Sequence, residues 1–343
     1  MNTINDTPSN LEVMNNIINS SWIAQCTCVI TKLGIPDFLS SGSKSAYEIA
    51  KHTNCNEDSI YRIMRLLSEV GIFSYNEDNK FSLSDLGDVL RTDHPHSLKY
   101  SALYLCSEQH WATWGNLIYS IQTGNSAFEK LYGKDYFSFL SEDATASSIF
   151  NECMKQRDKI RINHIINFYD FSRYKVIVDI GSGKGELLLQ ILKHNPLCKG
   201  VLFEKHNVIK EAFFEIKSNK LLDRCRIVSG NFFNSIPQLG DLYILSSVLH
   251  DWNDNKALKI LQNCRNILKK SQKLLIIEKI LDDDSKDVFL RSMDIEMLTI
   301  FGGKERTLPE FKCLLSKAGL CICNIYKLEH LHILECELKI TAK

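Results

Sequence analysis

Residues 174–195 read YKVIVDIGSGKGELLLQILKHN, and this stretch decides the fold. An apolar run ends at a loop that contains Gly181, Gly183 and Gly185, and an amphipathic pattern follows at once. Glycines allow a tight strand-to-helix turn whose backbone approaches a ligand closely, and the first turn of the helix presents free amides. The stretch therefore predicts a strand, a ligand-binding loop and a helix.

The same alternation continues toward the C-terminus. Short apolar runs that fit buried strands are separated by amphipathic runs that fit helices. Because such alternation is typical of a parallel sheet covered on both faces, we predict a doubly wound, mostly parallel α/β domain. The predicted strands are 174–181, 199–205, 224–233, 241–250 and 273–281.

The N-terminal half follows a mainly helical plan. Residues 11–40 carry apolar residues at helical spacing, with a stop at Gly34 and Pro36. Residues 45–92 read as helix, turn, helix and short hairpin, which is the pattern of a winged helix, and residues 100–165 read as helical. The two predicted domains are residues 1–165 and residues 166–343.

Charge argues against a nucleic-acid partner. The chain has 41 basic and 41 acidic residues, so its formal net charge is zero. The second helix of the winged module begins with Glu57 and Asp58, and the tip of its hairpin is Glu77-Asp78, where a DNA reader needs lysine and arginine. We interpret this module as a packing or dimerisation module.

The bulk sequence also sets expectations about location and cysteine chemistry. No apolar run reaches the roughly 20 residues that a bilayer-spanning helix needs, and the polar N-terminus does not resemble a secretory signal. We expect a cytoplasmic protein without a membrane partner. The 12 cysteines include no CxxC pair, so we predict reduced, mostly buried thiols and no metal site.

Two acidic residues bear on which ligand the glycine loop could bind. Asp179 precedes the first glycine, where it would repel a pyrophosphate but can contact the amino group of an amino-acid-like ligand. Glu204 ends the next strand, where a carboxylate can accept both hydroxyls of a ribose, although an ordinary solvated charge is the alternative. A dinucleotide has the same ribose, so Glu204 does not discriminate between the two ligands, but Asp179 with the compact loop favours S-adenosylmethionine over a dinucleotide. After the third strand, Asn231 and Phe232 could contact the adenine, whereas core packing is expected for Phe233.

The stretch VLHDWNDNKALKIL, residues 248–261, places His250 at the carboxyl end of the fourth predicted strand. An imidazole can take the proton of a hydroxyl that attacks a methyl group. A lone histidine at a strand end is usually structural, but Glu278 and Glu305 are expected at the same edge and can orient the imidazole. We predict His250 as the general base and Asp251 as a contact that orients the substrate.

These motifs, in this order, resemble the S-adenosylmethionine-dependent O-methyltransferases of the caffeate and acetylserotonin type and their bacterial natural-product relatives. The resemblance covers nearly the whole chain. It implies a Rossmann-like methyltransferase domain, a homodimer interlocked through the N-terminal helices, His250 as the family's base, and Glu278 and Glu305 as the acids that flank it. It rests on the winged helix, WATWGNLIYSIQTGNSAFEKLYG, FNECM, VDIGSGKG, VLFE, GNFF, VLHDWNDNKALKIL, LLIIEKIL and GGKERT.

The chain departs from the family at positions near the cofactor. Ser182 stands where the family has a glycine, Glu204-Lys205-His206 where it has Asp-Leu-Pro, and Asn231 where it has an aspartate. Plant members carry a lysine at the position of Ser246, whose loss removes a partner of the cofactor's carboxylate that Arg157 could replace. Because the carboxylate for the ribose and an acceptor for the adenine are kept, we expect cofactor binding at these positions, Ser246 included, to be retained with altered affinity.

The resemblance implies methyl transfer from S-adenosylmethionine to a hydroxyl, expected to be phenolic, of a small aromatic acceptor, without a metal. Two alternatives stay open. One is an enzyme of the same fold that catalyses a decarboxylation, hydroxylation or rearrangement, and the other is a winged-helix regulator that senses S-adenosylmethionine. The residues expected to line a mostly apolar acceptor pocket are Trp111, Phe150, Asn151, Met154, Met293 and Met297.

Overall fold

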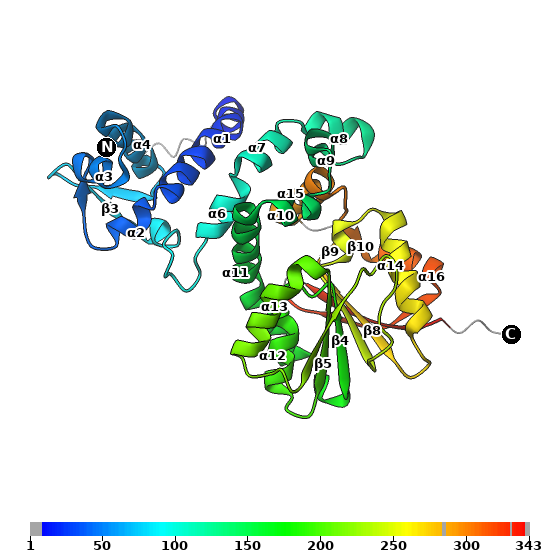
Figure 1. Ribbon diagram of the computed structural model, residues 1–343. Helices are drawn as coiled ribbons and strands as arrows, with labels where there is room; N and C mark the ends of the chain where they lie inside the picture. Colours follow the sequence, from blue (N-terminus) through cyan, green and yellow to red (C-terminus); the bar gives the residue numbers. More distant parts are fainter. Residues whose placement is uncertain (1–8, 283–285, 330, 340–343) are drawn as a thin grey trace, which may run out of the picture. The chain divides into compact units, whose positions relative to one another are not determined.

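The chain forms two compact units, each built from two segments of sequence (Figure 1). The computed structural model describes residues 9–282, 286–329 and 331–339. The predicted boundary near residue 165 falls inside helix α11 (Ala144–Phe168), and the division into domains at that point stays a prediction. The first unit comprises Met1–Trp111 and Thr145–Gln156, and the second comprises Ala112–Ala144 and Arg157–Lys343.

The first unit begins with a long helix, as predicted. Helix α1 (Asn10–Lys32) starts at a capping box in which the Ser9 side chain and Glu12 satisfy each other's backbone amides. Gly34, with a φ of 69°, ends the helical path and leads into α2. The other elements of this unit are α2 (Ile35–Leu39), β1 (Lys44–Ser45), α3 (Ala46–Thr53), α4 (Glu57–Glu69), β2 (Phe73–Tyr75), β3 (Lys80–Leu83), α5 (Asp85–Asp88) and α6 (Lys99–Leu105), followed by α7 (Glu108–Trp114).

The winged helix is present where the sequence predicts it. Helices α3 and α4 precede the hairpin of β2 and β3, and β1 completes a three-stranded antiparallel sheet. Met64 and Leu67 of α4 are fully buried in one core with Phe73 and Phe81 of the hairpin. The helical period of the apolar residues in α4 therefore serves this small core.

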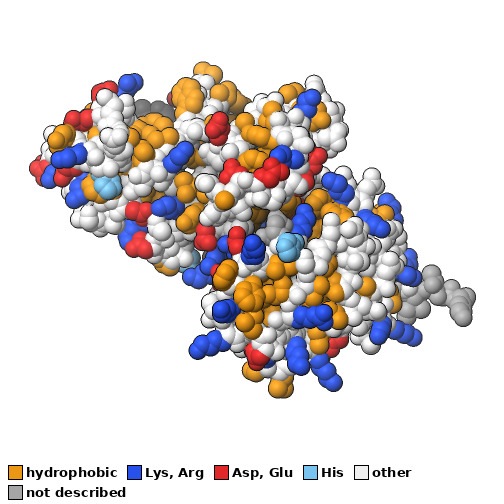
Figure 2. Space-filling model, in the orientation of Figure 1, with side chains coloured by type: hydrophobic (Ala, Val, Ile, Leu, Met, Phe, Trp, Pro, Cys, Tyr) orange, Lys and Arg blue, Asp and Glu red, His pale blue; other side chains and the backbone are white. Residues whose placement is uncertain are grey.

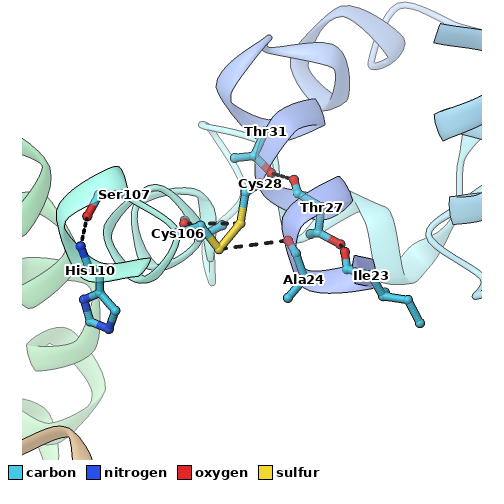
Figure 3. The surroundings of a disulfide bond; sticks show 9 residues. Ile23, Ala24, Thr27, Cys28, Thr31, Cys106, Ser107 and His110 are labelled. Atoms are coloured by element: carbon cyan, nitrogen blue, oxygen red, sulfur yellow. Dashed lines mark hydrogen bonds between the residues drawn. A yellow bond between two sulfur atoms is a disulfide. The ribbon is translucent and has the colours of Figure 1, made fainter. Parts of the chain in front are cut away.

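A disulfide bond between Cys28 and Cys106 corrects the prediction of reduced thiols at these two positions. Cys28 lies in α1, Cys106 follows the last residue of α6, and their Cα atoms are 6.0 Å apart (Figure 3). The partners are 78 residues apart in sequence, so no local spacing could reveal the pair. The ten remaining cysteines are free, as predicted.

The second unit contains a seven-stranded sheet in the order β11-β12-β8-β7-β4-β5-β6. The five strands from β8 to β6 are parallel, and β12 and β11 are antiparallel. Two short segments, β9 and β10, pair in parallel beside it. The strands are β4 (Val176–Ile180), β5 (Lys199–Glu204), β6 (Cys225–Ser229), β7 (Leu242–Ser246), β8 (Lys273–Glu278), β9 (Ile280–Leu281), β10 (Arg306–Thr307), β11 (Leu320–Lys327) and β12 (His332–Leu338).

Both faces of this sheet are covered, which explains why its strands read as continuous apolar runs (Figure 1). Val178 and Ile180 belong to the core that includes α14 and α16, whereas Ile177 belongs to the core that includes α12 and α13. The other elements of this unit are α8 (Leu117–Thr123), α9 (Ala127–Tyr132), α10 (Tyr136–Glu142), η1 (Phe171–Arg173), α12 (Glu186–His194), α13 (His206–Ser218), η2 (Leu249–Asp251), α14 (Asp254–Ile267), α15 (Val288–Glu296), the π-helical turn η3 (Met297–Phe301) and α16 (Leu308–Ala318).

The predicted fourth strand is shorter than expected. β7 ends at Ser246, and Ser247 adopts a left-handed conformation with a φ of 52° before the one-turn helix η2. His250 therefore lies in a turn beyond the strand. Among the described residues, no helix combines the length and apolarity that crossing a membrane would require.

Candidate active site

The glycine loop joins β4 to α12 as predicted. Gly181, Gly183 and Gly185 have φ values of 69°, 55° and 85°, a region that side chains with a Cβ rarely occupy. A Cβ on Gly185 would lie 2.5 Å from the Leu202 side chain, so this position also requires a close approach. Gly185 is the N-cap of α12, and no side chain caps that end. The loop thus leaves the first amides of α12 to a ligand.

The two predicted cofactor acids both lie at this loop. Asp179 is buried, and burial together with the Glu204 carboxylate raises its pKa to about 7, although Arg161 opposes the shift. Glu204 accepts hydrogen bonds from the backbone amides of Gly183 (2.9 Å) and Lys205 (2.7 Å). Burial raises the pKa of Glu204 and these amides lower it. Each carboxylate oxygen keeps a lone pair that can accept a ribose hydroxyl.

The positions that depart from the family pattern are also placed. The Ser182 hydroxyl is buried and has no hydrogen bond among the described residues. The Asn231 side-chain oxygen accepts from the Phe233 amide at 2.9 Å. Phe232 is buried and packs edge-on against Phe233 and Trp252, whereas Phe233 is half-buried. An orphaned hydroxyl, a glycine turn and buried acids together fit an adenosyl ligand with an amino-acid end.

Sequence reasoning missed Arg161. Its Nη1 donates to the hydroxyls of Ser246 (3.0 Å) and Ser247 (2.7 Å), and its Nη2 lies 2.8 Å from the Asp158 carboxylate. Arg161, rather than the predicted Arg157, therefore brings positive charge to Ser246. The two arginines are four residues apart on α11, which is the helical spacing that could have suggested the second candidate.

His250 is surrounded by carboxylates. Its Nδ1 lies 3.1 Å from Glu305 Oε1, with a hydrogen bond, and 3.5 Å from Glu278 Oε2. Its Nε2 lies 3.5 Å from Asp251 Oδ1. Both glutamates are almost fully buried, whereas the imidazole is 18% exposed. The structure thus brings the predicted base and its two predicted acids together, and it leaves Nε2 as the nitrogen on the side away from the glutamates.

Electrostatics at this cluster favour a charged imidazole. Burial lowers the pKa of His250, but the Glu278, Glu305 and Asp251 carboxylates outweigh it and raise that pKa to about 10. Burial raises the pKa of Asp251 to about 7 against the opposing effect of His250. Burial likewise raises the pKa of Glu278. The site therefore stabilises the imidazolium that forms when His250 accepts a proton.

The Glu278 carboxylate also bonds the backbone of the turn that carries His250. Its Oε1 accepts hydrogen bonds from the backbone amides of Val248 (3.0 Å) and Leu249 (2.9 Å), which are the residues just before His250. Ligand atoms of His250, Glu278 and Glu305 lie within 4.8 Å of one another, a spacing that a metal ion could also use. Glu305 already bonds the imidazole and Glu278 bonds the backbone of the turn, whereas Oε2 of each glutamate is buried without a hydrogen bond among the described residues.

Helix α14 begins beside the site. Its N-cap is Asn253, whose side-chain oxygen accepts from the Lys256 amide. Asp254 forms an ion pair with Arg306, with an oxygen 2.9 Å from Nη2. The indole of Trp252 is buried against Phe137, Phe232 and Phe233, so it packs the core beside the site.

The predicted acceptor residues are divided between the two units. In the first unit, Trp111 is 41% exposed, Phe150 packs edge-on against Tyr104, and Asn151 and Met154 are half-buried on α11. In the second unit, Met293 is half-buried and Met297 is buried. Their contact with an acceptor stays a prediction.

Comparison with known proteins decides the family. Residues 114–321 match the model of the O-methyltransferase domain, and residues 15–93 match that of the O-methyltransferase dimerisation domain. The chain belongs to the O-methyltransferase family. The dimerisation-domain match of this O-methyltransferase includes the winged-helix segment that the sequence identified and most of helix α1 before it.

Relatives of this O-methyltransferase come from bacterial natural-product biosynthesis. The phenazine O-methyltransferase of Lysobacter antibioticus is 34% identical over 90% of this chain and 91% of that protein. The mitomycin biosynthesis 6-O-methyltransferase of Streptomyces lavendulae is 33% identical over 90% of this chain and 88% of that protein. The solved mitomycin 7-O-methyltransferase has a TM-score of 0.92 at 32% identity and covers 96% of this chain and 97% of its own.

A further solved structure bears on the ligands. An O-methyltransferase of neocarzinostatin biosynthesis, with a TM-score of 0.84, is 29% identical over 92% of this chain and 95% of its own; it contains S-adenosyl-L-homocysteine and 1,4-dihydroxy-2-naphthoic acid. The present enzyme is an S-adenosylmethionine-dependent O-methyltransferase, so the predicted fold class, enzyme class and cofactor are confirmed. These relatives give no support to a non-methylating reaction or to a regulator.

Proposed function

We propose that this enzyme methylates a phenolic hydroxyl of a small aromatic natural product and that His250 is the general base. The observation that carries the proposal is the buried pair of glutamates at Nδ1 of His250, which leaves Nε2 on the side of the ring away from them. An imidazole held in this way can remove a hydroxyl proton and remain stabilised as imidazolium. The relatives named for phenazine, mitomycin and hydroxynaphthoate chemistry support an aromatic acceptor.

The chain's own residues account for the mechanism in three parts. S-adenosylmethionine supplies an electrophilic methyl group. Nε2 of His250 takes the proton of the acceptor hydroxyl, Glu305 and Glu278 hold the imidazole, and Asp251 orients the hydroxyl from beside Nε2. Holding both reactants in line supplies most of the acceleration, since effective molarities reach about 10⁵ to 10⁸ M, and the base adds about 10² to 10⁴.

The residues that would hold the cofactor gather at the carboxyl ends of β4, β5 and β7. Buried Asp179 fits the cofactor's amino group, Glu204 the ribose, and Arg161 with Ser246 the carboxylate. The full set that we propose is Asp179, Gly181, Gly183, Gly185, Glu204, Asn231, Phe232, Ser246 and Arg161. The acceptor residues that we propose are Asp251, Trp111, Phe150, Asn151, Met154, Met293 and Met297.

We further propose that the enzyme is a homodimer formed through its N-terminal helix. Apolar side chains of α1 are exposed, including Ile17 (60%), Ile18 (64%) and Trp22 (66%). Figure 2 shows apolar side chains gathered over this helix. Exposed apolar surface of this kind marks an interaction site, and the dimerisation-domain match favours a second copy of this chain as its partner. The biosynthetic roles of the bacterial relatives favour a cytoplasmic location.

The test is a turnover assay with purified protein. The enzyme is incubated with S-adenosylmethionine and a panel of phenols, catechols, hydroxyquinones and aminophenols, and both S-adenosylhomocysteine release and product mass are measured. The proposal expects a gain of one methyl group on oxygen for at least one phenol, with equimolar S-adenosylhomocysteine. Methylation confined to amines would contradict it.

A further inference from the structure

Arg306 is a fully buried arginine placed against the turn that carries His250. It is 1% exposed, although arginine is rarely buried without partners. Its Nη1 donates to the Leu249 carbonyl at 2.8 Å, and its Nη2 donates to the Trp252 carbonyl at 2.7 Å. These two carbonyls stand on either side of His250 and Asp251. One guanidinium therefore holds both ends of the segment that presents the base.

The residues just before Arg306 touch the same turn. A Cβ on Gly303 would lie 2.1 Å from the His250 carbonyl oxygen, so only glycine permits this approach. The Lys304 amide donates to that same oxygen at 2.8 Å, and Glu305 bonds the imidazole. Residues 303–306, which we call the clamp, thus contact the backbone and the side chain of His250.

The clamp is itself anchored. Arg306 and Thr307 form β10, which pairs in parallel with β9, two residues after Glu278. The Glu305 amide donates to Asp294 at 2.9 Å. The two acids at His250 are therefore tied to each other by a short strand pair. Displacement of the clamp would move the base and one of its acids together.

The hydrogen bonds of Arg306 require an arginine at this position. Its planar fork reaches two carbonyls in fixed directions and still bonds the Asp254 carboxylate through Nε at 3.0 Å. A lysine ammonium is a point charge and cannot span both carbonyls in this geometry. The Asp254 carboxylate is 65% exposed, so most of the fixing of Arg306 comes from the buried carbonyls.

We propose that Arg306 is a positioning residue that aims the His250 imidazole at the acceptor hydroxyl by holding the Leu249 and Trp252 carbonyls. The inference rests on the proposed role of His250 as the base. A small misdirection of the imidazole would weaken proton removal, and geometric errors of about 1 Å can lower rates about 10²-fold.

The first experiment compares Arg306→Lys with the wild type on a series of phenols of decreasing pKa. For a phenol that is neutral at the assay pH, we expect kcat to fall about 10-fold to 100-fold with the dissociation constant of S-adenosylmethionine unchanged. For a nitrophenol that is already ionised, the base is not needed, so the deficit should shrink to within about threefold. A general loosening of the fold would lower both rates alike.

The matched control is Arg224→Lys. Arg224 also donates to backbone carbonyls, those of Leu192, Asn195, Pro196 and Cys198, but it precedes β6 at the opposite end of the strands. Arg224→Lys should lower the melting temperature, and the ratio of its rate to the wild-type rate should be the same for neutral and ionised phenols. Gly303→Ala is the second test variant, because its methyl group would press on the His250 carbonyl while Arg306 is retained; it should show the same dependence as Arg306→Lys.

The outcomes separate this inference from the proposed function. If His250→Ala is inactive on neutral phenols while both clamp variants keep wild-type rates, or lose activity equally on neutral and ionised phenols, the positioning role is refuted and the base is retained. If His250→Ala has the wild-type rate, the assignment of His250 as the base is refuted, and the positioning role of Arg306 is refuted with it. A selective loss on neutral phenols in both clamp variants supports the positioning role.

Discussion

The proposed cofactor half and the proposed base half of this site are built in different ways. The cofactor half uses the backbone of one continuous stretch, the glycine loop from Gly181 to Gly185, with one acid before it and one on the neighbouring strand. The base half joins side chains from three separate segments, at His250, Glu278 and Glu305, and buries their charges. The first half resists substitution because of backbone conformation, whereas the second depends on matched charges.

Replacement of a flanking acid should have the largest effect within this comparison. Glu305→Gln removes a carboxylate that raises the pKa of His250, which is about 10 in the intact cluster. A base acts when it is neutral, so the wild-type rate should rise with pH through the alkaline range, and the rise should occur at lower pH in the variant. We expect the plateau kcat to fall about 10-fold to 100-fold because orientation is also lost.

The measurement is the pH dependence of kcat below about pH 9, for an acceptor phenol whose own pKa is about 10 and which therefore stays mostly neutral there. Gln190→Ala is the control, because Gln190 lies on α12 and its side chain forms one hydrogen bond among the described residues, to Glu186. An unchanged pH profile in Glu305→Gln would show that the carboxylate does not tune His250.

Asp179→Asn should produce a smaller and different change. A charged carboxylate binds an ammonium group more strongly than an amide does, so the dissociation constant of S-adenosylmethionine should rise about tenfold, with kcat at saturation nearly unchanged. Because burial raises the pKa of Asp179 to about 7, wild-type affinity should increase from pH 6 to pH 8 as the carboxyl ionises. Calorimetric titration at several pH values tests both points, and equal affinities at every pH would contradict them.

The same contrast explains what the sequence could predict. The glycine loop and Asp179 were predictable because spacing within one strand-loop-helix unit determines their positions, and Glu204 was predictable because it ends the neighbouring parallel strand. Glu278 was predictable because the carboxyl ends of parallel strands share one edge of a sheet. Both inferences need only local pattern and sheet polarity.

Other contacts depend on geometry that no local spacing contains. Arg161 reaches Ser246 from α11, 85 residues earlier in the chain, and Arg306 reaches Leu249 across 57 residues. The left-handed Ser247 ends β7 early and moves His250 into a turn, and a non-glycine residue gives no signal for that conformation. Cys28 and Cys106 likewise meet only through the packing of α1 on α6.

The most direct test of the central claim is a single-turnover experiment with His250→Ala. Enzyme loaded with S-adenosylmethionine is mixed with a phenol that the wild type methylates and that is neutral at the assay pH, and product formation is followed in time. We predict that cofactor affinity is unchanged and that the methyl-transfer rate falls about 10² to 10⁴-fold. A rate equal to that of the wild type, with the cofactor equally well bound, would contradict the assignment of His250 as the general base.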